Sequence, residues 1–292
     1  MRRLRSRRPG CDGSNNVNAI TMKLKVNIST CPNDTFMFDA MLNGRIDTGG
    51  YEFDVTLTDI EELNKSALAG EADVTKVSYA VVPQILENYN ILMSGSALGR
   101  GNGPLLVGRR EIAKDEMEGK KVAVPGIYTT ANMLMSKIFP EVKDKREYLF
   151  SDIAGVVLNG GADAGVLIHE GRFTYREKGL ELIANLGEEW EALCGLPLPL
   201  GAIAVSKKFL PEKQKAISIM LRKSVEYAMA HPHDSHEYVR KYAQEMEPKV
   251  MALHIDLFVN KFSVDLGEEG VRAVKELLNP QVPEGVLDKA FV

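Results

Sequence analysis

His169 is the residue of this sequence whose type and position best suit proton transfer. It follows an apolar run, residues 164–168, that is typical of a buried parallel strand, and it precedes Glu170, Gly171 and Arg172. A core strand therefore reaches the surface at this histidine. An imidazole, with an unperturbed pKa of about 6.5, takes up and returns a proton near neutrality. We interpret His169 as a candidate general base, with a purely structural histidine as the alternative.

A predicted helix start at residues 129–131 is a second candidate site. A predicted strand over residues 121–124 leads into it through Pro125 and Gly126, and two threonines and an alanine follow. Free backbone N–H groups and hydroxyls at a helix start bind anions such as a carboxylate or a phosphate. Ordinary capping of the helix by a threonine is the simpler interpretation, and the two are compatible.

Three histidines lie close together in the sequence, namely His231, His233 and His236. Ligands on one helix face need a spacing such as i and i+4, and Pro232 lies between two of the three. We expect one helix to end at Ala230 and Asp234 with Glu237 to cap the next. No metal is implied.

The glycine-rich run at residues 99–103 does not match a dinucleotide fingerprint. Its third glycine comes one residue early, and Pro104 precedes a predicted strand where the fingerprint needs a helix. The sequence also contains no Walker A pattern and no Gly-x-Ser-x-Gly elbow. The usual sequence signatures of redox and phosphoryl-transfer chemistry are therefore missing.

The composition is that of a globular protein of 292 residues, 45% of them hydrophobic, which is too apolar for disorder. Residues 1–22 hold five arginines and Asp12, hence +4, so the rest of the chain carries −8 of the total of −4. A body of that charge repels phosphate backbones, which argues against nucleic-acid binding. The longest apolar stretches fall far short of the roughly 20 residues that span a bilayer, so we expect no membrane insertion.

We expect residues 1–22 to be a disordered extension, with the folded chain beginning near Met22. The arginines are followed by a polar segment and not by the apolar core of a secretory peptide. With Cys11 set aside, Cys31 and Cys194 remain, which does not suggest a disulfide framework. These features predict a cytoplasmic protein.

The predicted elements alternate between strand and helix. Residues 24–28 and 51–57 alternate between apolar and polar positions, and residues 36–42 are predicted to be helical between them. Asp59, with Glu62 three residues on, opens a predicted helix that ends at Gly70. Such alternation favours the α/β class with a mostly parallel sheet.

One helix–strand unit occurs twice. Asp59, a helix, residues 70–73 and a strand that runs to Ser78 are similar to Asp152, a helix, residues 160–163 and a strand that runs to His169. The repeat suggests two similar α/β lobes. Open α/β sheets bind ligands at the carboxyl ends of their strands, so we expect Ser78 and His169 to face one cleft between the lobes.

Two turn-rich crossings, residues 94–104 and 195–201, divide the chain. They predict a first, discontinuous lobe from residues 23–98 and 201–292 and a second, inserted lobe from residues 99–200. This arrangement is similar to that of two-lobed solute-binding proteins. Helices are predicted beyond the second crossing at residues 211–230, 234–246 and 268–278.

Six segments, in the same order, resemble the 1,4-dihydroxy-6-naphthoate synthases of the futalosine route to menaquinone. The likeness runs from about Met22 to the C-terminus and is carried by residues 29–36, 73–79, 99–104, 125–132, 165–175 and 195–201. The resemblance implies a two-lobed α/β fold similar to type II periplasmic binding proteins, with the ligand cleft between the lobes. It also implies a cytoplasmic enzyme without a cofactor.

The family's chemistry would make the chain a carbon–carbon lyase. Its substrate would be cyclic de-hypoxanthine futalosine and its product 1,4-dihydroxy-6-naphthoate, with the sugar-derived fragment leaving. The family's proton acceptor corresponds to His169, and its ligand contacts correspond to Lys76, Val77, Ser78, Thr130 and Ala131. The alignment leaves open whether Thr129 or Thr130 is the contacting threonine.

Two other functions remain open at this stage. One is a non-catalytic solute-binding protein of the same fold, and the other is the sibling dehydratase of chorismate derivatives in the same pathway. The expected partner is in each case a small molecule. The sequence does not predict an oligomeric state, nor does it assign roles to Asn33, Asp34, Glu170 or Arg172.

Overall fold

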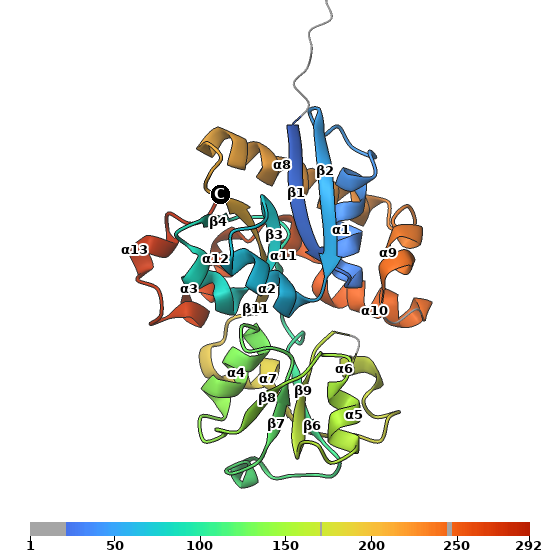
Figure 1. Cartoon of the computed structure of the whole chain (residues 1–292), viewed down its shortest axis with the longest axis vertical. Coiled ribbons are helices and arrows are strands. Elements are labelled where there is room, and N and C mark those ends of the chain that lie inside the picture. Colours follow the sequence, from blue (N-terminus) through green and yellow to red (C-terminus); the bar gives the residue numbers. More distant parts are fainter. Residues whose placement is uncertain (1–21, 170, 244–246) are drawn as a thin grey trace, which may run out of the picture.

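The computed structural model describes residues 22–169, 171–243 and 247–292. Two lobes, each a sheet covered by helices, lie one above the other (Figure 1). The predicted α/β class with two lobes is therefore confirmed. Met22 begins the first strand, whereas the rest of the predicted extension, residues 1–21, lies outside the described residues.

The first lobe is built on a sheet with the strand order β2-β1-β3-β11-β4, to which β5 adds by pairing with β11. Its strands in the described chain are β1 (Met22–Ser29), β2 (Tyr51–Thr58), β3 (Val74–Ser78), β4 (Tyr89–Ile91), β5 (Ala97–Gly99) and β11 (Leu198–Ser206). Strand β1 runs parallel to β2 and β3, whereas β11 runs antiparallel to β3, β4 and β5. The sheet is mixed and not mostly parallel, because the chain returning from the second lobe enters it in the opposite direction.

The second lobe has a sheet with the strand order β10-β6-β9-β7-β8. Its strands are β6 (Leu105–Gly108), β7 (Val122–Val124), β8 (Lys145–Glu147), β9 (Ala164–Leu167) and β10 (Glu181–Asn185). Its helices are α4 (Thr130–Ile138), α5 (Ile153–Leu158), α6 (Gly171–Thr174) and α7 (Leu186–Cys194). Every residue of β9 is buried, as expected for a central strand that ends at the candidate base.

Nine helices of the described chain cover the first lobe: α1 (Pro32–Leu42), α2 (Ile60–Leu68), α3 (Val82–Ile85), α8 (Pro211–Ala230), α9 (His236–Tyr242), α10 (Pro248–Phe258), α11 (Lys261–Val264), α12 (Gly267–Leu278) and α13 (Glu284–Leu287). The predicted helix at 211–230 is confirmed at both ends. The Asp59 side chain accepts hydrogen bonds from the backbone N–H groups of Glu61 and Glu62, as its capping position predicts.

Helix α1 starts four residues earlier than expected, at Pro32, because proline is well suited to a first helical turn. Residues 32–41 of this helix are all buried, since it lies between the sheet and helices α8, α9 and α10. A helix that is buried on all sides brings its polar residues into the interior. Asn33 and Asp34 therefore need partners there.

The predicted helix at 234–246 was wrong at its start and in its cap, and its last three residues, 244–246, lie outside the described residues. The observed helix α9 is His236–Tyr242, and Ser235 and not Asp234 occupies the position before it. The Asp234 carboxylate instead accepts a hydrogen bond from the Tyr227 hydroxyl at 2.7 Å. Helix α10, which follows, was not predicted.

The two crossings between the lobes lie side by side. Leu198 at the start of β11 is the antiparallel partner of Gly99 at the end of β5. The glycine-rich run continues from there to Gly103, where an added Cβ would lie 2.2 Å from the Gly187 backbone. Glycine is therefore required by close packing of two backbones. The exact division of the chain, residues 23–98 with 201–292 and residues 99–200, stays a prediction.

One apolar core runs through both lobes. It includes Tyr79 and Leu277 of the first lobe and Val122 and Leu134 of the second. A separate core lies in the first lobe between the sheet and helices α1 and α8. The shared core holds the lobes against each other in this arrangement. Among the described helices none is both long and apolar enough to cross a bilayer.

Candidate active site

A pocket lies where the two lobes meet. The first lobe contributes Ser29, Asn33, Asp34, Lys76, Ser78 and His254 to its wall, and the second contributes Thr129, Thr130, Ala131, His169 and Arg172. Ser78 and His169, the two predicted strand-end residues, therefore do face one cleft.

His169 has a strained backbone and lies two residues beyond the end of β9. Its φ of 53° is the one value in the left-handed region for a non-glycine residue of the described chain. Such strain costs roughly 1–3 kcal/mol and is concentrated at functional sites. The Nδ1 atom lies 3.2 Å from the Cys31 Sγ atom, and the ring meets the Phe150 ring edge-on at 4.9 Å. The backbone and these contacts fix the imidazole against the pocket.

The surroundings of His169 keep its ring neutral. Burial lowers its pKa to about 4, with the Asp34 carboxylate opposing this effect and the Lys76 ammonium adding to it. A neutral imidazole has a free lone pair at pH 7 and is able to accept a proton.

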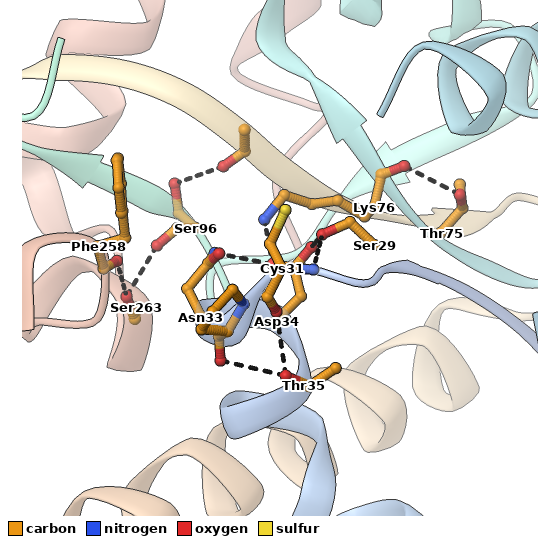
Figure 2. A network of polar contacts seen from close by, with 12 residues as sticks. Ser29, Cys31, Asn33, Asp34, Thr35, Thr75, Lys76, Ser96, Phe258 and Ser263 are labelled. Atoms are coloured by element: carbon orange, nitrogen blue, oxygen red, sulfur yellow. Dashed lines mark hydrogen bonds and ion pairs between the residues drawn. The ribbon is translucent and has the colours of Figure 1, made fainter. Parts of the chain in front are cut away.

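A buried network of polar contacts in the first lobe includes several residues that line the pocket (Figure 2). The Asp34 carboxylate accepts hydrogen bonds from the Lys76 ammonium at 2.5 Å, the Ser29 hydroxyl at 2.6 Å and the Asn33 amide at 3.0 Å. Lys76 is on β3 and the other three are at the end of β1 and the start of α1. A buried ion pair with its remaining positions satisfied is held in a single geometry. Lys76 and Asp34 therefore neutralise each other.

The two threonines at the start of α4 have different partners. The Thr129 hydroxyl accepts from the Asn132 N–H at 3.2 Å and donates to the Gly126 carbonyl, so Thr129 is the helix cap. The Thr130 hydroxyl donates to the Leu200 carbonyl at 2.7 Å, across the boundary between the lobes. Both residues line the pocket, and the choice between them as ligand contact stays a prediction.

The other predicted contacts are divided between pocket and core. Lys76, Ser78 and Ala131 line the pocket, whereas Val77 has its side chain in the shared apolar core. Successive side chains of a strand point to opposite faces, which explains why Val77 differs from its two neighbours. The Ser78 hydroxyl accepts a hydrogen bond from the Asn64 amide at 3.0 Å.

Arg172 brings a positive charge to the pocket. Its Nη2 atom donates to the Gly101 carbonyl at 2.8 Å, while its Nη1 atom is buried without a hydrogen-bond partner in the described chain. Burial lowers the pKa of its guanidinium, which Glu188 partly opposes. With Lys76 and Asp34 paired, Arg172 leaves the pocket wall with an excess positive charge.

His254 is a pocket residue that the sequence reasoning missed. It is 1% exposed on α10, and its ring stacks on that of His169 with centroids 5.9 Å apart and planes 17° apart. The buried residues of α10, Val250, Met251, His254 and Phe258, have the spacing of one helix face. That apolar face with a single histidine was the available signal.

The remaining histidines lie away from the pocket. The His231 ring stacks on Tyr227, and His236 begins α9 at the surface. Within residues 22–169, 171–243 and 247–292, no group of three or more His, Cys, Asp or Glu side chains has a geometry suited to a metal ion.

Two α/β lobes with a pocket between them define the periplasmic-binding-protein-like fold. The alkanesulfonate-binding protein SsuA of Xanthomonas axonopodis pv. citri has this fold, with a TM-score of 0.67 over 92% of this chain and 98% of its own at 11% identity. A protein of Archaeoglobus fulgidus is more similar, with a TM-score of 0.82 and 34% identity over 87% of this chain and 95% of its own.

The chain belongs to the menaquinone biosynthesis family, whose model matches residues 24–280. The 1,4-dihydroxy-6-naphthoate synthase of Thermus thermophilus is 43% identical over 87% of this chain and 92% of its own length. The enzyme of the same name from Streptomyces coelicolor is 42% identical over 90% of this chain and 94% of its own. These findings confirm the resemblance and the two-lobed fold expected from the sequence.

Proposed function

We propose that this protein is a carbon–carbon lyase that converts cyclic de-hypoxanthine futalosine to 1,4-dihydroxy-6-naphthoate. The observation that carries the proposal is the neutral, strained His169 in a pocket between two lobes, which the start of α4 also lines. The names of two relatives that match nearly their full lengths support the same reaction.

His169 acts as the general base in this scheme. Its neutral ring removes a proton from the substrate, after which the carbon–carbon bond to the sugar-derived fragment breaks and the product ring becomes aromatic. The bound anion raises the pKa of the imidazole above its value in the free pocket, because an opposite charge favours the protonated form. The base is then better matched to neutral pH.

The start of α4 and Arg172 provide the positive charge that binds the substrate carboxylate. The helix start offers the backbone N–H groups of Thr130 and Ala131, which carry partial positive charge. The excess charge of Arg172 adds to the attraction for one anionic group in a pocket of low dielectric. Lys76 serves chiefly to hold Asp34, and Ser78 completes the wall of the first lobe.

Closure of the lobes brings the parts of this site together. His169 and Thr130 belong to the second lobe, whereas Lys76, Ser78 and His254 belong to the first. Lobe movement therefore completes the site around the substrate and expels water from it.

The test is incubation of the purified protein with cyclic de-hypoxanthine futalosine and detection of the naphthoate by mass spectrometry. Formation of the naphthoate by the wild type and its loss in His169→Asn are the expected results. Binding of the compound without conversion would instead indicate a solute-binding protein. Dehydration of a chorismate derivative under the same conditions would indicate the sibling enzyme of the pathway.

A further inference from the structure

His254 carries an unsatisfied polar atom inside the pocket wall. Its Nε2 atom lies 3.0 Å from the Asn33 Oδ1 atom, whereas its Nδ1 atom is buried and has no hydrogen-bond partner among the described residues. A buried polar atom without a partner is destabilising, and native proteins contain few of them. Nδ1 of His254 therefore requires a functional explanation.

The neighbouring network fixes which nitrogen of His254 carries the proton. The Asn33 amide donates through Nδ2 to the Asp34 carboxylate at 3.0 Å, so its oxygen is the atom that faces His254. Asp34 itself only accepts, because the Lys76 ammonium and the Ser29 hydroxyl also donate to it (Figure 2). The proton of His254 is consequently on Nε2, and Nδ1 presents a lone pair.

Burial and nearby cations keep this ring neutral. The pKa of His254 lies well below its ordinary value because of burial, and the Lys76 and Arg172 cations lower it further. Nδ1 is thus a hydrogen-bond acceptor over the whole neutral range. Two neutral imidazoles, one from each lobe, border the same pocket.

We propose that His254 is a substrate-contacting residue whose Nδ1 atom accepts a hydrogen bond from a hydroxyl group in the sugar-derived part of the substrate. A neutral acceptor needs a donor, which a hydroxyl offers and a carboxylate does not. The groups suited to the carboxylate, at the start of α4 and on Arg172, are all donors. The identity of the substrate rests on the proposed function, whereas the acceptor at Nδ1 does not.

Nuclear magnetic resonance of the full chain with 15N-labelled histidine tests the acceptor directly. The His254 signals are identified by their loss in His254→Gln. We expect a protonated Nε2 and an unprotonated Nδ1 in the wild type at pH 7, and an Nδ1 signal that moves on addition of cyclic de-hypoxanthine futalosine. A proton on Nδ1, or an Nδ1 signal that the compound leaves unchanged, would overturn the proposal.

Two substitutions separate the two sides of the imidazole ring. Gln reproduces the donor of Nε2 toward Asn33 and lacks the acceptor at Nδ1, whereas Asn places an amide oxygen near the Nδ1 position. We expect His254→Gln to raise KM for the substrate about tenfold or more, the loss expected for one hydrogen bond in a buried site. His254→Asn should lose less. Affinity for the naphthoate product, which lacks the sugar-derived fragment, should stay unchanged in both.

The surface residue His236 provides the matched control, since His236→Gln alters the same side chain away from the pocket. Equal losses of substrate and product affinity in His254→Gln would assign His254 a structural role and overturn the proposal. A wild type that fails to form the naphthoate, yet shows the expected tautomer and ligand response, would refute the proposed function alone.

Discussion

The hydroxyl of Thr130 donates a hydrogen bond to the carbonyl of Leu200 at 2.7 Å, and this bond joins the two lobes. The same oxygen also accepts from the backbone N–H of Ala80, at 3.3 Å. Thr130 opens α4 of the second lobe, whereas Leu200 and Ala80 belong to the first. The hydroxyl therefore links the two lobes at the start of α4.

Replacement of Thr130 by Val should weaken ligand binding through this bond. Val keeps the shape of the side chain and removes both hydrogen bonds, so the closed arrangement loses stability relative to an open one. We expect naphthoate affinity, measured by calorimetry, to fall by roughly 1–3 kcal/mol. Ser136→Ala, an exposed hydroxyl on the same helix, should have no effect. Unchanged affinity in Thr130→Val would show that lobe closure does not depend on this contact.

His169→Asn should abolish most turnover and leave the fold intact. Asn retains some hydrogen bonding and has no basic nitrogen, so kcat should fall by about 100-fold to 10,000-fold, the usual range for a lost general base. Asn also tolerates the left-handed backbone at this position, with its φ of 53°. A stable variant with near-normal kcat would move the base elsewhere, with Asp34 the next residue to test.

Acid should destabilise the protein before most carboxylates titrate. The pKa of His169 is lowered to about 4 in the folded state and is about 6.5 in the unfolded chain, so the unfolded chain binds more protons between these values. The contribution of His169 to the free energy of unfolding is therefore fully present above about pH 6.5. It decreases as the pH drops toward 4, by at most about 1.4 kcal/mol per pH unit.

His254 contributes to the acid instability with the same sign, because burial also lowers its pKa. Urea unfolding at pH values from about 4.5 to 7.5 covers the range in which these histidines affect stability, and it measures how the free energy of unfolding changes with pH. His169→Asn should make the free energy of unfolding depend less on pH. An unchanged pH dependence in this variant would contradict the attribution of the acid instability to His169. His233→Asn, at an exposed position, is the control.

The buried pair of Lys76 and Asp34 should show strong coupling. Lys76→Met leaves the Asp34 carboxylate without its cation at a fully buried position and should lower the free energy of unfolding by about 3–5 kcal/mol. Asp34→Asn added to Lys76→Met removes the stranded charge and should recover part of that loss. Thermal and urea unfolding of the two single variants and the double variant measure the coupling. Additive losses would contradict it.

Local pattern predicted those parts of the fold that local chemistry determines. Helix α8 was predicted with its observed bounds because Pro211 suits a first turn and the helix ends before Pro232. Helix α9 was predicted to begin too early because Asp234 matched a capping pattern, whereas its carboxylate accepts a hydrogen bond from Tyr227. Tertiary contacts in such cases override a local signal.

Local sequence pattern predicted only part of the candidate site. His169 stood out by its place after an apolar strand, and the lobes did bring it opposite Ser78. The partner of Asp34 could not be predicted, because Lys76 is 42 residues away and meets it only when β1 and β3 pair. The place of His254 in the site could not be predicted either, because it depends on how α10 packs against His169 of the other lobe.

The pairing of Leu198 with Gly99 in the first sheet means that the chain leaves for the second lobe and returns from it at neighbouring points. Paired residues of antiparallel strands have Cα atoms about 4.5–5.5 Å apart, a gap that a hairpin turn of two residues closes. The second lobe is thus an insertion whose two connections to the first lobe are adjacent. Exchange of this inserted lobe between relatives would transfer His169, Arg172 and the start of α4 together, while the first sheet keeps its strand order.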